Sequence, residues 1–357
     1  MKKIYALAAC ALLSSCTTIS GIGEDNTPAP SALMNYQSQL TPTLLWSRST
    51  NPAQTVSIFD LSNGMVFWKS PLKQALVAGP TIGNQSVYVG DNEGGVWALN
   101  LNSGKAEWHA TLSDPIVSRP LVSNGKVFVR TLDGTVWALK NVDGSVAWTA
   151  AETIPTMVLS GGSKPVLMGN NIVVGSSNGK LTAYDAATGT VKWKSVIAEP
   201  QGPSDVEKMV DIVADPKLSG SAIYVVTYQG NLSAVNAQTG QVLWQTPVSS
   251  YSGLAVSTNA IFVTDAKGRV FAFDRKTGKQ IWKQTYLEYR VLTAPTIMGN
   301  SIVIGDGEGV THWLSQSTGE TVARVNVSSS PIKSAPLVSG NNVYILSRNG
   351  LVSAYTA

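Results

Sequence analysis

The sequence predicts an all-β protein in which short sheets repeat around a ring, the β-propeller architecture. Three observations support this fold class: one pattern recurs about every 40 residues, glycine-rich turns separate short apolar runs, and no segment has a sustained helical period. The composition agrees, since 32 of 357 residues are Gly, 10 are Trp and 13% are charged, against about 25% in ordinary globular proteins. We therefore expect a large core built from one repeated unit.

A turn glycine four residues before a tryptophan marks each unit. The pairs are Gly64/Trp68, Gly104/Trp108, Gly144/Trp148, Gly189/Trp193, Gly240/Trp244 and Gly278/Trp282, and Gly319/Ala323 repeats the spacing without the aromatic. Between these marks each unit reads as strand, tight turn, strand, tight turn, strand, as in residues 119–140 with Asn124-Gly125 and Asp133-Gly134 at the turns. The tryptophan then lies on a fourth strand.

The two ends of the repeat region complement each other. The chain stops after a third strand, residues 351–355, and a spare strand, residues 44–46, precedes the first unit. Pairing the two closes the ring and removes free sheet edges. Since Trp46 and Trp68 are 22 residues apart, the first unit is short. We predict an eight-bladed β-propeller of four-stranded blades, with an abridged first blade and closure by the N-terminal strand; seven blades is the alternative.

The N-terminus has the features of an export signal. Lys2 and Lys3 precede an apolar run of about ten residues, which small residues follow. The apolar run is too short to cross a bilayer. The ending Leu13-Ser14-Ser15-Cys16 resembles the bacterial lipoprotein signal, which implies cleavage after residue 15 and acylation of Cys16. An ordinary secretory signal is the alternative. We expect a signal peptide over 1–15, a flexible tether over 16–42 and a propeller over 43–357.

Charge and cysteine usage exclude several functions. The net charge is +4, and 24 basic residues remain against 22 acidic ones without Lys2 and Lys3, which is too balanced for a nucleic-acid binder. Both cysteines, Cys10 and Cys16, precede the body, so disulfides, thiolate metal sites and a cysteine nucleophile are excluded there. His109 and His312 have no metal-ligand spacing.

The repeat grammar, as in residues 183–193 (AYDAATGTVKW), resembles the quinoprotein-type propeller repeat. That resemblance raises the alternative of a periplasmic oxidoreductase that binds a quinone and calcium. Asp91 with Glu93 and Asp306 with Glu308 are candidate calcium ligands, but both pairs fall at the same turn of the repeat. We interpret them as solvated turns and expect no enzyme activity, no cofactor and no metal.

A more specific match follows from Tyr289-Arg290 and the string from Gly305 to Trp313 (GDGEGVTHW). It resembles the BamB family of lipoproteins, a subunit of the β-barrel assembly machinery of the bacterial outer membrane. The resemblance implies a non-enzymatic scaffold on the periplasmic face of the outer membrane. Its implied partners are BamA, other machinery subunits and unfolded outer-membrane proteins. Thr17, following Cys16, lacks the aspartate of inner-membrane lipoproteins and favours the outer membrane.

Two neighbouring connections between units are unusually long, which predicts a binding surface. From the repeat tryptophan to the next opening proline there are 17 residues after Trp148 and 23 after Trp193, against 12 or 13 elsewhere. The first contains Met157, Val158 and Leu159, and the second contains acidic residues around Lys208. An apolar anchor beside a charged rim is typical of transient interfaces.

The BamB resemblance implies that these loops contact BamA through Met157, Val158, Leu159, Lys208 and Asp211. Ser160 stands where the family has an arginine, and Val213 stands at the second position of an aspartate pair, with Asp215 nearby. These departures put the remaining salt links in question. A propeller that binds a solute or polymer in its central channel is a further alternative.

Overall fold

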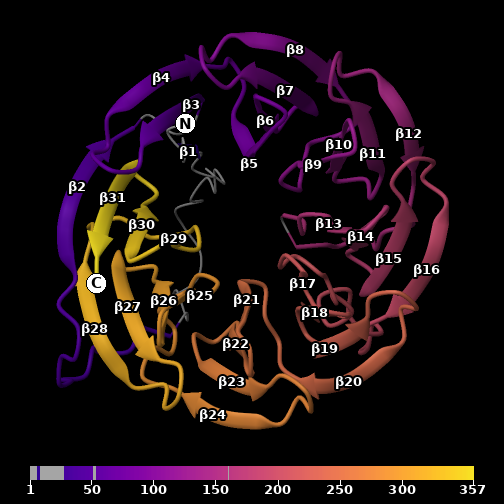
Figure 1. The fold of residues 1–357 in the computed structure, drawn as a ribbon. Helices are drawn as coiled ribbons and strands as arrows, with labels where there is room; N and C mark the ends of the chain where they lie inside the picture. The colour runs from indigo at the N-terminus through magenta and orange to yellow at the C-terminus, as the bar shows by residue number, and fades with distance from the viewer. Residues whose placement is uncertain (1–5, 9–27, 51–53, 160) are drawn as a thin grey trace, which may run out of the picture.

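The computed structural model describes all residues except 1–5, 9–27, 51–53 and 160. The described residues form strands, turns and loops with no helix, so the predicted all-β class is confirmed. They build seven four-stranded sheets and one three-stranded sheet, which stand like blades around a common axis (Figure 1). The protein is a β-propeller.

Six of the four-stranded blades are continuous in sequence, and each runs from an inner first strand to an outer fourth strand (Figure 1). Their strands are β5 (Leu76–Gly83), β6 (Ser86–Asp91), β7 (Gly95–Asn100) and β8 (Ala106–Thr111); β9 (Leu121–Ser123), β10 (Lys126–Arg130), β11 (Val136–Lys140) and β12 (Val146–Ala150); β13 (Val166–Met168), β14 (Asn171–Gly175), β15 (Lys180–Asp185) and β16 (Val191–Val196). The other three are β17 (Lys217–Ser219), β18 (Ala222–Val226), β19 (Asn231–Asn236) and β20 (Val242–Pro247); β21 (Gly253–Val256), β22 (Ala260–Thr264), β23 (Val270–Asp274) and β24 (Gln280–Gln284); β25 (Thr296–Met298), β26 (Ser301–Gly305), β27 (Val310–Ser315) and β28 (Thr321–Asn326).

The seventh four-stranded blade joins the two ends of the propeller. It consists of β29 (Leu337–Ser339), β30 (Asn342–Leu346), β31 (Leu351–Thr356) and the N-terminal β2 (Thr43–Ser49). β2 pairs antiparallel with β31, from Thr43 opposite Thr356 to Ser49 opposite Leu351. This is the closure that the spare strands at the two ends predict.

The remaining sheet contains the short first unit. It consists of β3 (Thr55–Asp60), β4 (Val66–Pro71) and β1 (Ala6–Ala8), in the order β1-β3-β4. β4 carries Trp68 and is therefore the fourth strand of its unit, with β3 as the third. β1 pairs with β3 in the place of a second strand and comes from the predicted signal peptide, a pairing that the sequence did not predict.

Neighbouring blades are joined by the tryptophan of one and the turn glycine of the next. Trp148 donates its indole N–H to the carbonyl of Ala186 at 3.1 Å, and its ring lies directly over Gly189, where an added Cβ would be 2.7 Å from the ring. Glycine also suits this turn because its φ is +77°. The same glycine contact recurs at Trp46, Trp68, Trp108, Trp193, Trp244 and Trp282. The repeated spacing therefore encodes the contact between blades.

The hydrophobic core lies mainly between blades. Val173 of β14 and Ile223 and Val225 of β18 belong to one buried cluster, and Phe262 of β22 and Ile302 of β26 belong to another. Second strands are buried on both faces and read as continuous β-branched and aromatic runs, as expected for strands covered from both sides. Each blade thus depends on its neighbours for burial.

Part of the expected tether contacts the propeller. In residues 28–42, Leu33 and Leu40 pack against two core clusters, Ser31 donates its amide to Glu288 at 3.0 Å, and the Arg324 guanidinium lies 4.9 Å from the centre of the Tyr36 ring. The tether was expected to be free along its whole length, and these contacts hold its second half against the ring. Within the described ranges, no helix has the length and apolar character needed to span a membrane.

Candidate functional site

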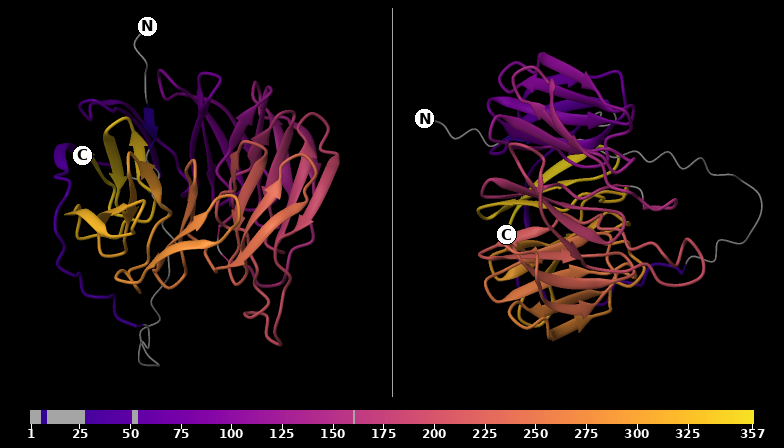
Figure 2. Two further views of the ribbon diagram at one scale, coloured as in Figure 1. Left: turned by 60° about the horizontal axis from the view of Figure 1, so that its bottom comes forward. Right: turned by 90° about the vertical axis from the view of Figure 1, so that its right-hand side faces the viewer.

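One face of the ring carries the long connections. In each blade, the turn between second and third strands and the connection from the fourth strand to the next blade lie on the same face, because antiparallel strands alternate in direction. We call this the loop face. The two longest connections, residues 151–165 between β12 and β13 and residues 197–216 between β16 and β17, project from it on adjacent blades (Figure 2).

The two long loops are bonded to each other. The Leu159 amide donates to Oδ1 of Asp211 at 3.2 Å, and the Lys164 amide donates to Oδ1 of Asp215 at 2.8 Å. The predicted adjacency of the loops is confirmed. Asp211 and Asp215 of the second loop thus fix the backbone of the first.

Asp211 also ties in the next blade. Its backbone carbonyl accepts the amide of Tyr228, in the turn between β18 and β19, while its side chain holds Leu159. The side chain is 1% exposed. Burial raises the pKa of Asp211, against the opposing effects of the Leu159 amide, the Ser177 hydroxyl and the Arg130 charge. Three backbone segments of the loop face therefore meet at this one residue.

The structure places the predicted binding residues at different depths. Met157 is 43% exposed, Lys208 is exposed, and Val158 and Leu159 are half-buried. Asp211 was expected to contact a partner directly, but its buried side chain is bonded within the protein, so we assign it a positioning role. Cys16 lies outside the described residues.

Asp215 does not stand free beside Asp211. It forms a salt bridge with Arg119 in addition to its bond with the Lys164 amide. Val213 stands at the position of the second aspartate of the family pair. It faces Gly161, and a Cβ added at Gly161 would be 3.4 Å from a Val213 methyl. Asp211 and Asp215 of this loop thus hold the two loops together.

Two features of the surface escaped the sequence analysis. Val206 in the second loop is 52% exposed, and its carbonyl accepts the side-chain amide of Gln229 at 2.8 Å. Tyr251, exposed in the following connection, lies 6.3 Å from Tyr228 between ring centres. The available signal was Tyr228-Gln229-Gly230, where the other units have an acidic residue, Asn or Lys before the glycine. The apolar part of the loop face thus extends to the next blade.

The aspartates read as solvated turns are buried. Asp91 is 1% and Asp306 0% exposed, because each carboxylate accepts amides of its own turn: Oδ1 of Asp91 from Gly95 at 2.7 Å, and Oδ1 of Asp306 from Val310 at 2.8 Å. The solvated interpretation was therefore wrong for the aspartates. The exposed residues of these turns are Asn92, Glu93 and Glu308.

Asp306 joins Arg290 and His312, from the segments that carry the BamB resemblance, into one buried network. Its Oδ2 accepts Nε of Arg290 at 2.6 Å and lies 2.9 Å from Nε2 of His312, and Arg290 donates to the carbonyl of Ser31 at 3.0 Å. Burial raises the pKa of Asp306, but its bonds to His312, Val310 and Arg290 outweigh burial and hold the pKa low. Burial lowers the pKa of His312. This network fastens the N-terminal segment to the ring.

His109 lies near Asp91, because a Cβ added at Gly95 would be 2.8 Å from Nε2 of His109 and would also meet the Asp91 carboxylate. His109 is exposed and stacks on Trp97 at 3.8 Å between ring centres. In the part of the chain that the structure describes, no three His, Cys, Asp or Glu side chains are placed to hold a metal ion.

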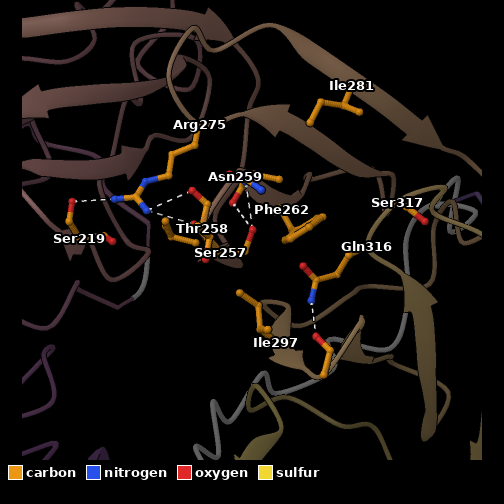
Figure 3. Close-up of a pocket in the computed structure, with 13 residues that line it drawn as sticks. Ser219, Ser257, Thr258, Asn259, Phe262, Arg275, Ile281, Ile297, Gln316 and Ser317 are labelled. Carbon is orange, nitrogen blue, oxygen red and sulfur yellow. Dashed lines mark hydrogen bonds between the residues drawn. The ribbon is translucent and has the colours of Figure 1, made fainter.

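A pocket of about 900 Å³ lies on the face opposite the loop face, between the blades of β21–β24 and β25–β28 (Figure 3). Arg275 lines it and donates to the carbonyl of Ser219 at 3.0 Å and to the hydroxyl of Tyr224 at 3.0 Å. Its other lining groups include Ser257, Gln316 and Phe262. Because Arg275 donates to groups of the neighbouring blade, we assign it a structural role at the contact between blades.

A family model described as outer membrane protein assembly factor BamB matches residues 52–284. The chain belongs to the BamB family. It is 40% identical to the BamB of Legionella pneumophila, over 84% of this chain and 85% of that protein. The crystal structure of BamB from Moraxella catarrhalis superposes with a TM-score of 0.82 at 25% identity, covering 89% of this chain and 100% of that one.

Dehydrogenases among the similar solved structures share the fold only. A europium-containing methanol dehydrogenase gives a TM-score of 0.75 at 13% identity, over 90% of this chain and 95% of that chain. A likeness at that identity concerns the fold, whereas the BamB relatives match in sequence along most of the chain. The assembly-factor family is therefore the better guide to function than the enzymes.

Proposed function

We propose that this protein is a non-enzymatic subunit of the outer-membrane β-barrel assembly machinery, which docks through its loop face on the barrel subunit BamA. Membership of the BamB family supports the assembly function. The observation that supports the docking surface is the junction at Asp211, which holds two long loops and a neighbouring turn in one arrangement. A prearranged surface loses less entropy on binding than free loops would.

The contacts that we propose differ from those that the sequence indicated. Met157 supplies the exposed apolar anchor, with Val158 and Leu159 at its base and Lys208 as a charge on the rim. Val206 and Tyr251 extend the apolar area. Asp211 acts from below by fixing the Leu159 backbone. Apolar anchors with a polar rim match the usual distribution of energy in protein interfaces.

The same proposal includes the anchor and the domain division. Residues 1–15 act as a lipoprotein signal peptide, and acylated Cys16 holds the protein in the outer membrane on its periplasmic side. Residues 16–42 connect this anchor to the propeller, which residues 43–357 form. We count the three-stranded sheet as the abridged first of eight blades, because β4 contributes Trp68 at the repeat position. Several acyl chains give lasting attachment where one does not.

A binding measurement with the periplasmic region of BamA tests the docking surface. Met157→Glu places a charge on the proposed anchor and is expected to weaken binding at least about tenfold, the usual effect of losing an interface anchor. Val142→Glu is the matched control: Val142 is 76% exposed, in a turn between third and fourth strands on the opposite face. Binding that is equally strong in both variants and the wild type would refute the loop-face proposal.

A further inference from the structure

The sheet of β1, β3 and β4 has one strand that the mature protein would lack. β1 comprises Ala6–Ala8 and lies on the axis side of β3 (Figure 1), with Ala6 opposite Asp60 and Ala8 opposite Ile58. These residues precede Cys16 and lie within the predicted signal peptide. Cleavage after residue 15 therefore removes the strand that covers the inner edge of β3.

β3 stays in place without β1 because neighbouring blades hold both of its faces. Val56 and Ile58 belong to a buried cluster with Val87 and Val89 of β6. Phe59 belongs to a different cluster, with Tyr344 of β30 and Trp46 of β2. Loss of β1 thus opens an edge of a strand that remains fixed between two blades.

The open edge offers backbone donors and acceptors in a defined register. The Asp60 amide donates to Met65 at 2.8 Å, so Asp60 faces β4. Successive residues of a strand direct their backbone groups to alternate edges, which turns the amides of Phe59 and Ser57 toward the edge that β1 covers. A strand that enters there pairs antiparallel, as β1 does.

The seven other blades show what kind of segment fits this position. Each of their second strands has three successive buried residues at its centre that are β-branched or aromatic, as in Val87-Tyr88-Val89, Ile223-Tyr224-Val225 and Ile302-Val303-Ile304. Among the described residues, β3 pairs only with β1 and β4, so without β1 the position of a second strand in the first blade has no occupant from its own sheet. An extended segment rich in Val, Ile, Tyr and Phe has the chemistry to occupy it.

We propose that signal-peptide removal opens a strand-binding slot on β3, and that the slot binds an extended, unfolded segment rich in β-branched and aromatic residues as an added antiparallel strand. Addition of a strand to a sheet edge is an established mode of peptide recognition. The proposal deepens the assembly function and rests on it for the source of the segment, an unfolded β-sheet protein. The docking surface for BamA lies elsewhere on the ring.

Peptide binding to the mature chain, residues 16–357 with Cys16→Ser, tests the slot. The probe is a fluorescent peptide with the sequence of residues 221–230 (SAIYVVTYQG), flanked by lysines for solubility, and binding is followed by fluorescence anisotropy. We expect saturable binding, and competition by a peptide with the sequence of residues 4–9 (IYALAA), which contains the β1 segment. Failure of a large excess of the competitor to displace the probe would overturn the proposal.

A variant pair isolates the backbone contact. Ser57→Pro removes an amide that points into the slot and leaves the ladder with β4 intact, since proline is tolerated where the amide faces away from the partner strand. It should weaken binding about tenfold, the effect of losing one to two hydrogen bonds. Ser57→Ala keeps the amide and should bind like the wild type. Equal binding by both variants contradicts the proposal.

A modified probe gives the same test without altering the protein. Methylation of alternate backbone nitrogens removes the donors on one edge of the peptide and keeps all side chains, so an added strand should bind at least about tenfold more weakly. Undiminished binding by peptides methylated on either edge would show nonspecific apolar contact and refute the slot. BamA binding is measured separately on the same chain: normal BamA binding without peptide binding refutes the slot alone, and the reverse refutes the docking proposal alone.

Discussion

The contact between Trp148 and Gly189 makes a quantitative prediction for Gly189→Ala. An alanine at φ +77° has a left-handed backbone that is less favourable by about 1–2 kcal/mol. Its Cβ would also stand 2.7 Å from two ring carbons of Trp148, and because the ring is 9% exposed it has little room to move. Overpacking of this kind adds about 1–3 kcal/mol.

Gly169→Ala is the matched control for backbone strain. Gly169 also has a positive φ, +57°, but an added Cβ there meets nothing within 4 Å. Both variants carry the left-handed penalty, so the difference between them measures the blade contact. We expect Gly189→Ala to be about 1–3 kcal/mol less stable than Gly169→Ala.

Urea and thermal unfolding, followed by far-ultraviolet circular dichroism, provide the measurement. For a chain of this size the difference corresponds to a melting temperature lower by roughly 2–8 °C. The double variant Gly189→Ala with Trp148→Leu should be less destabilised than the sum of its single changes, because the smaller side chain relieves the clash. Equal melting temperatures for the two alanine variants would refute the proposed packing of the Trp148 ring on Gly189.

Three further predictions concern the buried groups. Burial lowers the pKa of His312, so below about pH 6.5 the unfolded chain binds a proton at this residue that the folded chain does not. The free energy of unfolding therefore decreases as the pH is lowered. His312→Gln should lose this part of the pH dependence, measured as urea midpoints between pH 7.5 and 5. Asp211→Ala leaves the Leu159 amide unpaired, which destabilises the folded arrangement of the loop by about 1–3 kcal/mol and should speed proteolysis within residues 152–162. Asp211→Asn keeps an acceptor for this amide and should keep the loop as resistant to proteolysis as in the wild type. A chain that begins at residue 41 loses the packing of Leu33 and Leu40 and should be less stable by roughly 2 kcal/mol, and an unchanged melting temperature would show that those contacts contribute nothing.

The fold could be predicted because its signal is local. Each glycine and tryptophan are four residues apart, and the turn residues of each hairpin are adjacent, so periodicity alone reveals the repeat. The same spacing conceals the actual contact, since Gly189 lies on Trp148 of the preceding blade and not on Trp193 of its own. The sequence thus predicted the units and their length, and the quinoprotein resemblance implied that the tryptophan packs across the interface between blades. It did not predict that the turn glycine of the next unit receives the ring.

The candidate site was harder to predict because its determinants are distant in sequence. Asp211 looks like any loop aspartate until Leu159, 52 residues away, is placed beside it. Burial of Asp91 and Asp306 likewise depends on how their turns fold back over the carboxylates. The lengths of the two loops sufficed to predict that they project side by side from one face, whereas the distinction between exposed and buried residues required the three-dimensional structure.

Closure by β2 and β31 sets the order in which the ring can form. Thr50, which follows β2, donates its hydroxyl to Gly350 across 300 residues of chain. Joining segments so far apart opposes folding by roughly 5 kcal/mol of chain entropy, and such nonlocal pairings form slowly. Because β31 (Leu351–Thr356) follows all the other described strands in the chain, the earlier blades can assemble first, but the ring cannot close until β31 has been made. Loss of even the final strand would leave an open arc in place of a ring.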